Sequence, residues 1–132
     1  MQSKSPKYCK IDDDNELPKS KSHIILEIVE YVPDTIVCKT IIKNTGGKMS
    51  AVAFDKKEKF CEKTAEYDTY VQIIDGKAEV TIGNKDLKLN LGDSIIIPVN
   101  AKHCFKANSE FKMITTIIKH TGKTKAVAIK SN

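Results

Sequence analysis

The stretch that most constrains the fold spans residues 68–103, where short strand-like segments alternate with tight turns. Residues 70–74 are rich in β-branched and aromatic side chains, and Asp75 and Gly76 after them form a dipeptide typical of two-residue hairpin turns. Residues 77–82 then alternate apolar and polar side chains. The pattern predicts a β-hairpin here and favours an all-β fold.

Tight turns and strands continue on both sides of this hairpin. Gly83 and Asn84 give a second turn signal, and Gly92 marks a third turn before residues 94–97. Further strands are expected at residues 35–42, 48–54, 61–64, 104–107 and 110–118. About nine short strands, with turns every eight to twelve residues or so, are typical of a sandwich or barrel of the jelly-roll kind.

A histidine follows the strand at 94–97 at a spacing that matches a known motif. Gly92, Pro98 and His103 reproduce a glycine, five residues, a proline, one residue, a glycine, two residues and a histidine, with Asn100 at the second glycine. This spacing resembles the second of the two motifs of the cupin superfamily, which are small β-barrels. The resemblance implies a cupin-type double-stranded β-helix, a jelly-roll barrel.

The first cupin motif is matched only at its end. In metal-binding cupins it contains two histidines and a glutamate that bind the metal, and it ends in a glycine, which Gly76 matches here. Counting back from Gly76 puts Thr69 at the glutamate and Lys56 or Lys57 at the opening glycine. The two histidine positions fall on Glu62 and Thr64, or on Lys63 and Ala65. The resemblance therefore implies that the metal-ligand positions are empty and that no metal or other cofactor is bound.

The resemblance covers residues 36–118 and is closest to a metal-poor branch of small single-domain cupins. Members of that branch tend to carry a histidine at the position of Lys63, which this chain lacks. Cupins include oxygenases, isomerases, epimerases, sugar-binding regulators and storage proteins, so the fold does not specify the activity. Whether the protein is an enzyme stays open at this point.

The 132 residues are enough for one domain. Residues 1–20 are rich in lysine, serine and aspartate and are expected to form a flexible N-terminal arm, whose acidic run, Asp12, Asp13, Asp14 and Glu16, is expected to be solvated. Residues 21–119 are expected to form a single barrel domain that begins with a short amphipathic helix, because Ile24, Ile25, Ile28 and Val29 recur at helical spacing before Pro33. Residues 120–132 are expected to be a lysine-bearing C-terminal tail, in which 126–129 are a candidate edge strand.

All 22 basic residues are lysines, and the formal net charge is +5. Base readout and bidentate phosphate binding favour arginine, so we expect a lysine-rich solvated surface and no nucleic-acid partner. An anionic ligand or an acidic membrane surface is the alternative use of this charge.

The cysteines and the hydropathy pattern bear on location. Cys9, Cys38, Cys61 and Cys104 show neither C-x-x-C nor zinc spacing and are expected to be free thiols in a reducing compartment. The polar N-terminus lacks the features of a secretory signal, and no apolar run approaches the roughly 20 residues of a membrane span. A cytoplasmic protein without a membrane span is therefore expected.

Alternation along the strands predicts an assembly. If Thr69 points into the barrel, then Val71 and Ile73 also do, while Tyr70 and Ile74 point away. The last strand, residues 110–118, is likewise apolar on both faces. Strands that are apolar on both faces need a covering layer, so we expect the helix to cover part of the outside and a second copy to cover the rest, in a sheet-on-sheet homodimer.

The same alternation places Cys61, Lys63, Thr69 and His103 near the mouth or interior of the barrel. A metal site is one interpretation, but a lysine ammonium repels a cation and offers no lone pair. Metal-free catalysis is a second, with His103 as the candidate general acid or base and Cys61 as a nucleophile. We favour a third, in which these four residues bind a small molecule without a metal, and the cationic groups prefer a carboxylate, phosphate or sugar acid. The alternative is a cupin enzyme of the isomerase, epimerase or dioxygenase type that uses His103 in a metal-free or non-standard metal site.

Overall fold

The structure, a computed structural model, describes residues 9–119. Within this range the chain forms ten β-strands and one short 3-10 helix, η1. Their bounds are β1 Ile11–Asp13, η1 Ile25–Glu27, β2 Ile36–Asn44, β3 Gly47–Phe54, β4 Lys59–Glu62, β5 Asp68–Gly76, β6 Ala78–Ile82, β7 Lys85–Leu89, β8 Ser94–Ile97, β9 His103–Lys106 and β10 Phe111–Ile118. The C-terminal tail, 120–132, and its candidate edge strand lie outside the described residues.

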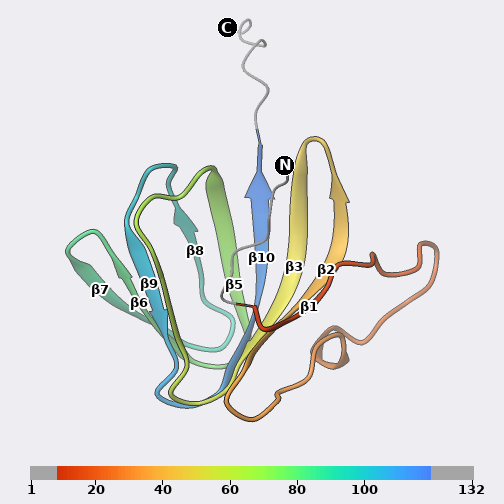
Figure 1. Cartoon of the computed structure of the whole chain (residues 1–132), viewed down its shortest axis with the longest axis horizontal. Coiled ribbons are helices and arrows are strands. Elements are labelled where there is room, and N and C mark those ends of the chain that lie inside the picture. The colour runs from red at the N-terminus through yellow and green to blue at the C-terminus, as the bar shows by residue number, and fades with distance from the viewer. Residues whose placement is uncertain (1–8, 120–132) are drawn as a thin grey trace, which may run out of the picture.

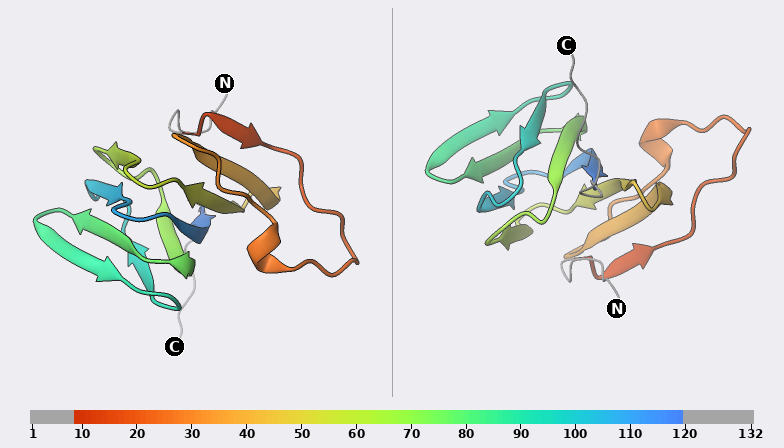
Figure 2. Two further views of the ribbon diagram at one scale, coloured as in Figure 1. Left: turned by 90° about the horizontal axis from the view of Figure 1, so that it is seen from below. Right: turned by 90° about the horizontal axis from the view of Figure 1, so that it is seen from above.

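The strands form two sheets that face each other, which confirms the expected all-β barrel (Figures 1 and 2). The six-stranded sheet has the order β1-β2-β3-β10-β5-β8, and the four-stranded sheet has the order β4-β9-β6-β7. The strands spread apart at the end that is uppermost in Figure 1, where the β2–β3 turn and the end of β10 lie. We call this end the mouth. No helix within 9–119 is long and apolar enough to cross a membrane.

The turn at Asp75 and Gly76 does not close a hairpin. β5 pairs with β10 and β8 in one sheet, whereas β6 pairs with β7 and β9 in the other, so the chain changes sheets here. The hairpin predicted at this dipeptide is wrong, because the pairing is decided by distant strands and not by the turn. The turn at Gly83 and Asn84 does join a hairpin, β6–β7.

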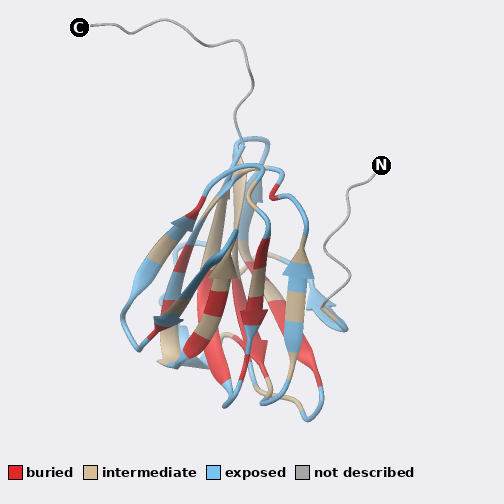
Figure 3. Ribbon diagram, turned by 90° about the vertical axis from the view of Figure 1, so that its left-hand side faces the viewer, coloured by how far each residue is buried: buried red, intermediate tan, exposed pale blue. Residues whose placement is uncertain are grey.

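The core lies between the sheets, towards the end opposite the mouth (Figure 3). Val71 and Ile73 on β5 are buried in it, as the alternation predicts. The rings of Phe54 and Phe111 stack with centroids 4.6 Å apart. Burial of large apolar side chains at roughly 25 cal/mol per Å² is the main force that holds the two sheets together.

The outer face of the six-stranded sheet is partly covered by residues 28–32. Val29 is buried there among Val37, Ala53 and Ile114, which point outward from three strands. The predicted amphipathic helix is wrong, since only η1 forms and its residues are all exposed. Of the apolar residues that suggested a helix, only Ile28 and Val29 pack on the sheet, in an irregular segment, while Ile24 and Ile25 stay exposed.

Two polar contacts hold this segment in place. The Tyr31 hydroxyl donates to the Asp75 carboxylate at 2.7 Å, and the buried Lys112 ammonium donates to the Leu26 carbonyl at 2.6 Å. The Lys112 nitrogen also lies 5.0 Å from the centroid of the Tyr31 ring. Burial and the hydrogen bond to Asp75 raise the pKa of Tyr31 well above its ordinary value, so the phenol stays protonated and keeps donating.

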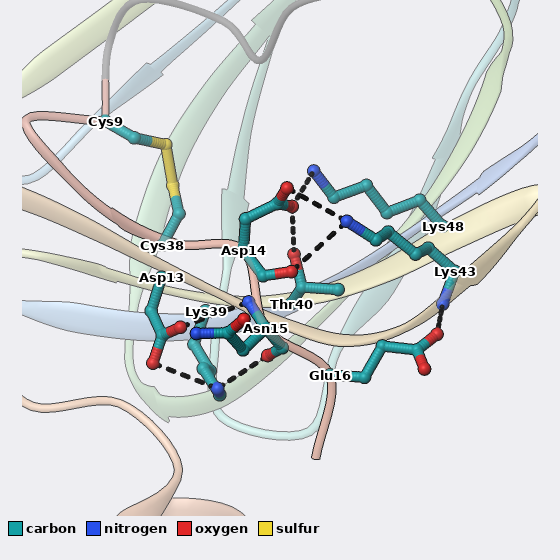
Figure 4. Close-up of polar contacts among 10 residues, drawn as sticks. All are labelled: Cys9, Asp13, Asp14, Asn15, Glu16, Cys38, Lys39, Thr40, Lys43 and Lys48. Carbon is teal, nitrogen blue, oxygen red and sulfur yellow. Dashed lines mark hydrogen bonds and ion pairs between the residues drawn. A yellow bond between two sulfur atoms is a disulfide. The ribbon is translucent and has the colours of Figure 1, made fainter.

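The arm is attached to the sheet from Cys9 onward. β1 runs parallel to β2, and a disulfide joins Cys9 to Cys38 on β2. Carboxylates of the acidic run pair with lysines of the β2–β3 hairpin, as Figure 4 shows for Asp13 with Lys39 at 3.0 Å. The run that the sequence marked as solvated therefore contributes fixed contacts.

A second disulfide joins Cys61 on β4 to Cys104 on β9, which are direct partners across the two strands. No described cysteine is free, so the prediction of free thiols is wrong. The cause is tertiary, since sheet pairing brings together residues 43 positions apart. Disulfides are typical of oxidising compartments, so the reason for expecting a reducing compartment is lost.

Candidate functional site

The candidate site lies at the mouth, where β4 ends and β9 begins. Pairing of these strands sets Glu62 opposite His103 and Phe60 opposite Phe105. Side chains of directly opposed residues share one face of a sheet, and here that face is the inner one, because Phe105 is a core residue. The ring of His103 lies next to both phenylalanines, with centroids 6.5 Å from Phe60 and 5.8 Å from Phe105.

The two ring nitrogens of His103 have different partners. Nδ1 lies 3.1 Å from the carbonyl oxygen of Ala101, which can only accept, so Nδ1 carries a hydrogen and donates it. Nε2 lies 3.3 Å from the carboxyl oxygen Oε1 of Glu62. The two groups are within ion-pair distance and attract each other when the imidazole is protonated. The pair therefore sets a carboxyl group beside an imidazole nitrogen, two groups that can each give or take a proton.

Exposure differs sharply between the partners. The side chain of His103 is 6% exposed and that of Glu62 is 40% exposed. A molecule at the mouth can therefore contact the Glu62 carboxyl group directly, whereas the His103 imidazole is buried next to that group. Glu62 is thus the accessible group of the site, although the sequence analysis predicted His103 as the candidate.

The sequence did contain a signal for Glu62. One of the two alignments of the first cupin motif puts Glu62 at a histidine position. Because the alternative alignment was equally open, only the register of β4 against β9 selects Glu62.

Two predicted ligand-binding residues lie near this end. Thr69 lies on the inner face of β5, the same face as Val71 two residues later. Its hydroxyl donates to the Tyr67 carbonyl at 3.2 Å. Lys63 is exposed and comes directly after β4, in an irregular segment between β4 and β5. The structure does not place Thr69 or Lys63 in hydrogen-bonding contact with His103.

Cys61 does not belong to this group. It precedes Glu62 on β4, so its side chain points to the outer surface, where it is bonded to Cys104. Its expected roles as an interior ligand contact and a thiol nucleophile are therefore not supported. The alternation that put Cys61 inside was counted from Thr69, and the irregular segment between β4 and β5 breaks that count.

The residues present do not fit a metal. His103 and Glu62 supply one nitrogen and one carboxyl group, and no group of three or more His, Cys, Asp or Glu side chains within 9–119 is arranged to hold an ion. Transition metals in proteins usually take three or four such ligands. The other first-motif positions carry lysine, threonine or alanine side chains.

The loop before His103 is fixed by a residue in the left-handed region. Asn100 has φ of 72°, a conformation that asparagine tolerates better than most non-glycine residues. Its amide donates to the Ala65 carbonyl at 2.7 Å, and the Asp68 carboxylate accepts from the Val99 amide at 2.9 Å. The position where the cupin motif has its second glycine thus keeps the backbone that glycine would provide.

The family is shown by the sequence itself. The family model described as "Cupin domain" matches residues 52–118, just over half of the chain, and this span includes β4, β9 and the His103 loop. The chain therefore belongs to the cupin family. No protein with a curated description matches the sequence significantly.

Solved structures agree with this fold. The chain is similar to a conserved protein of unknown function from Streptococcus pyogenes, with a TM-score of 0.76, 20% identity, and coverage of 86% of this chain and 99% of that one. It is also similar to a cupin superfamily protein from Desulfitobacterium hafniense, with a TM-score of 0.73, 19% identity, and coverage of 79% and 95%. At these identities the likeness is one of fold.

A third similar structure is a Cupin 2 conserved barrel domain protein from Leptotrichia buccalis. Its TM-score is 0.67 and its identity 28%, and the match covers 71% of this chain but 46% of the longer protein. The chain thus corresponds to one part of that molecule.

Proposed function

We propose that this cupin-domain protein binds a small polar molecule at the mouth, through the Glu62 carboxyl group backed by His103. The observation that carries the proposal is the 3.3 Å contact between the accessible Glu62 carboxyl group and Nε2 of the buried His103. Such a group can both accept and donate hydrogen bonds, as recognition of hydroxyl or amino groups requires. Because the accessible group of the pair is a carboxyl group, the pair does not attract an anion by itself.

An acidic group on the ligand would instead be recognised by Lys63. Its ammonium is close in sequence to Glu62, and the segment that carries it is exposed. A sugar acid, with hydroxyl groups towards Glu62 and its carboxylate towards Lys63, combines both preferences. This retains the expected anionic ligand while moving the source of selectivity from His103 to Lys63.

A melting screen of the full chain against small acids, sugars and nucleotides tests the proposal. A ligand present at about 100 times its Kd adds about 2.7 kcal/mol to the free energy of unfolding and raises Tm by several degrees. We expect this rise to disappear in Glu62→Gln and to shrink in His103→Gln and Lys63→Gln.

Glu66→Gln is the matched control, because Glu66 is an exposed carboxylate in the same segment. It should keep the full rise in Tm. A ligand whose effect survives Glu62→Gln, or vanishes equally in Glu66→Gln, would show that it binds elsewhere.

The same pair favours a second candidate function, metal-free proton transfer. An accessible carboxyl group 3.3 Å from an imidazole nitrogen has the form of a general acid–base pair. An isomerase or epimerase would use it to remove and return a proton on a bound ligand. Ligands found in the screen would be incubated with the protein in D2O. Uptake of deuterium at carbon that is lost in Glu62→Gln would establish this activity. A ligand that takes up no deuterium would mean that the protein only binds it.

We also propose that the protein forms a homodimer through the outer face of the six-stranded sheet. Residues 28–32 cover only part of this face. On the remainder, Tyr70 and Ile96 are directly paired across β5 and β8 and are 38% and 63% exposed, and Ile118 is 55% exposed. A second copy that covers these apolar side chains would remove them from water.

A further inference from the structure

A separate groove lies at the mouth, beside the turn between β2 and β3. Its volume is about 580 Å³, within the range of roughly 300–1,000 Å³ typical of small-molecule pockets. The turn contributes Asn44 and Thr45, and the charged lining consists of Lys43, Lys48, Lys119 and Asp14. Lys119 belongs here because its amide donates to the Gly46 carbonyl at 2.9 Å, which attaches the end of β10 to the turn.

The groove has an excess of positive charge. Three ammonium groups face one carboxylate among its lining residues. Within the described range Lys119 has no carboxylate partner, and its nitrogen lies 5.8 Å from the centroid of the Tyr67 ring. Clustered like charges repel, so a bound anion would lower the electrostatic energy of the groove.

One anion is already seated there and comes from the arm. The Asp14 carboxylate lies 2.9 Å from the Lys43 ammonium and 3.8 Å from that of Lys48, and it accepts from the Thr40 hydroxyl at 3.2 Å (Figure 4). Asp14 follows β1 directly and is not part of the hairpin that supplies the lysines. Its carboxylate thus marks a position where these side chains coordinate an oxyanion.

The turn also supplies donors next to the ammonium groups. The Asn44 side-chain oxygen accepts from the Gly46 amide at 2.7 Å, so the amide nitrogen of the same side chain is the group left to donate to a ligand. A site with ammonium and amide donors and a single carboxylate suits an oxyanion.

We propose that this groove binds the phosphate or carboxylate group of a small molecule, and that Asp14 is a built-in competitor for the same lysines. The ligand would replace the Asp14 carboxylate between Lys43 and Lys48, while Lys119 supplies the charge that Asp14 does not neutralise. The groove shares no residue with the Glu62–His103 pair. Anion binding in the groove can therefore be tested independently of the function proposed above.

The test titrates the full chain with inorganic pyrophosphate, and separately with citrate, at low ionic strength in a calorimeter. Loss of one exposed charge contact should weaken binding about two- to fivefold in Lys43→Gln and in Lys48→Gln. Asp14→Asn should strengthen binding, because it removes both the competitor and a repelling charge. A preference for pyrophosphate would identify phosphate as the group recognised, and a preference for citrate would identify carboxylate.

Lys85→Gln is the matched control, since Lys85 is an exposed lysine on β7 of the other sheet and its loss changes the net charge equally. It should bind both anions as the unaltered protein does, as should His103→Gln. Equal weakening in Lys85→Gln would show diffuse charge attraction and overturn the proposal. Absence of binding to either anion, or Asp14→Asn without a gain in affinity, would also overturn it.

Discussion

At the scale of the residue, the backbone needs left-handed conformations at a few positions. Gly76 and Gly92, both glycines of the cupin motifs, have φ of 70° and 89°. Asn100, at the second glycine of the second motif, has φ of 72°. These three positions therefore need a left-handed backbone, and the one without glycine carries a residue type that tolerates this geometry well.

Gly76 has a second constraint, which can be measured. A Cβ atom at Gly76 would clash with the Glu110 carbonyl oxygen, whereas one at Gly83, with φ of 60°, would meet open space. Gly83→Ala should cost about 1–2 kcal/mol from its conformation alone, and Gly76→Ala should cost clearly more. Urea unfolding curves of the two variants measure the difference. Equal midpoints would mean that close packing at Gly76 contributes nothing.

At the scale of the element, the arm is the segment whose attachment depends most on charge. The hydrogen bond from Lys39 lowers the pKa of Asp13, and the one from Lys43 lowers the pKa of Asp14. The backbone hydrogen bond from Lys43 lowers that of Glu16. A depressed carboxyl pKa means that these pairs stabilise the attached arm above the ordinary carboxyl pKa of about 4 and that this stabilisation is lost as pH falls through the lower folded values.

Hydrogen exchange of the Leu17 amide reports on this attachment, because it donates to the Ile41 carbonyl at 3.1 Å. Its protection factor should fall as pH is lowered below the ordinary carboxyl pKa of about 4, with the Cys9–Cys38 disulfide still intact. The core amide of Ile73, which donates to the Asp93 carbonyl at 3.0 Å, serves as the control and should keep its protection. Unchanged protection of Leu17 at low pH would show that the ion pairs do not hold the arm.

At the scale of the whole molecule, the two faces of the six-stranded sheet are unequal. The inner face supplies most of the core, while the outer face is covered by residues 28–32 over only part of its area. The uncovered part contains the exposed apolar side chains of β5, β8 and β10. This asymmetry is the physical basis for the proposed homodimer.

Ile96→Lys should weaken the dimer by at least roughly tenfold, because it puts a charge at the centre of an apolar contact. Sedimentation equilibrium over a range of concentrations measures the dissociation constant. Leu91→Lys is the control, as Leu91 is 66% exposed but lies in the turn before β8. A monomer mass for the unaltered protein at all concentrations, or equal weakening by the control, would contradict the proposed interface.

The sequence by itself determined most of the strands and, within a continuous strand, the face on which each side chain lies. Alternation placed Val71 and Ile73 inside, because side chains on a strand must point to opposite faces in turn. The spacing of Gly92, Pro98 and His103 indicated the family, and the motif count left no histidine at the metal-ligand positions of its first motif. These are local properties of the chain, so they can be read without knowing which strands meet.

Only the tertiary structure decided what depends on pairing between distant segments. It separated β5 from β6 at a turn typical of hairpins, joined the cysteines in two disulfides, and replaced a helix by an irregular cover. It also set Glu62 against His103, which the motif count left undecided. Strand register and sheet partners are fixed by the packing of the whole core, and a linear pattern carries little information about that packing.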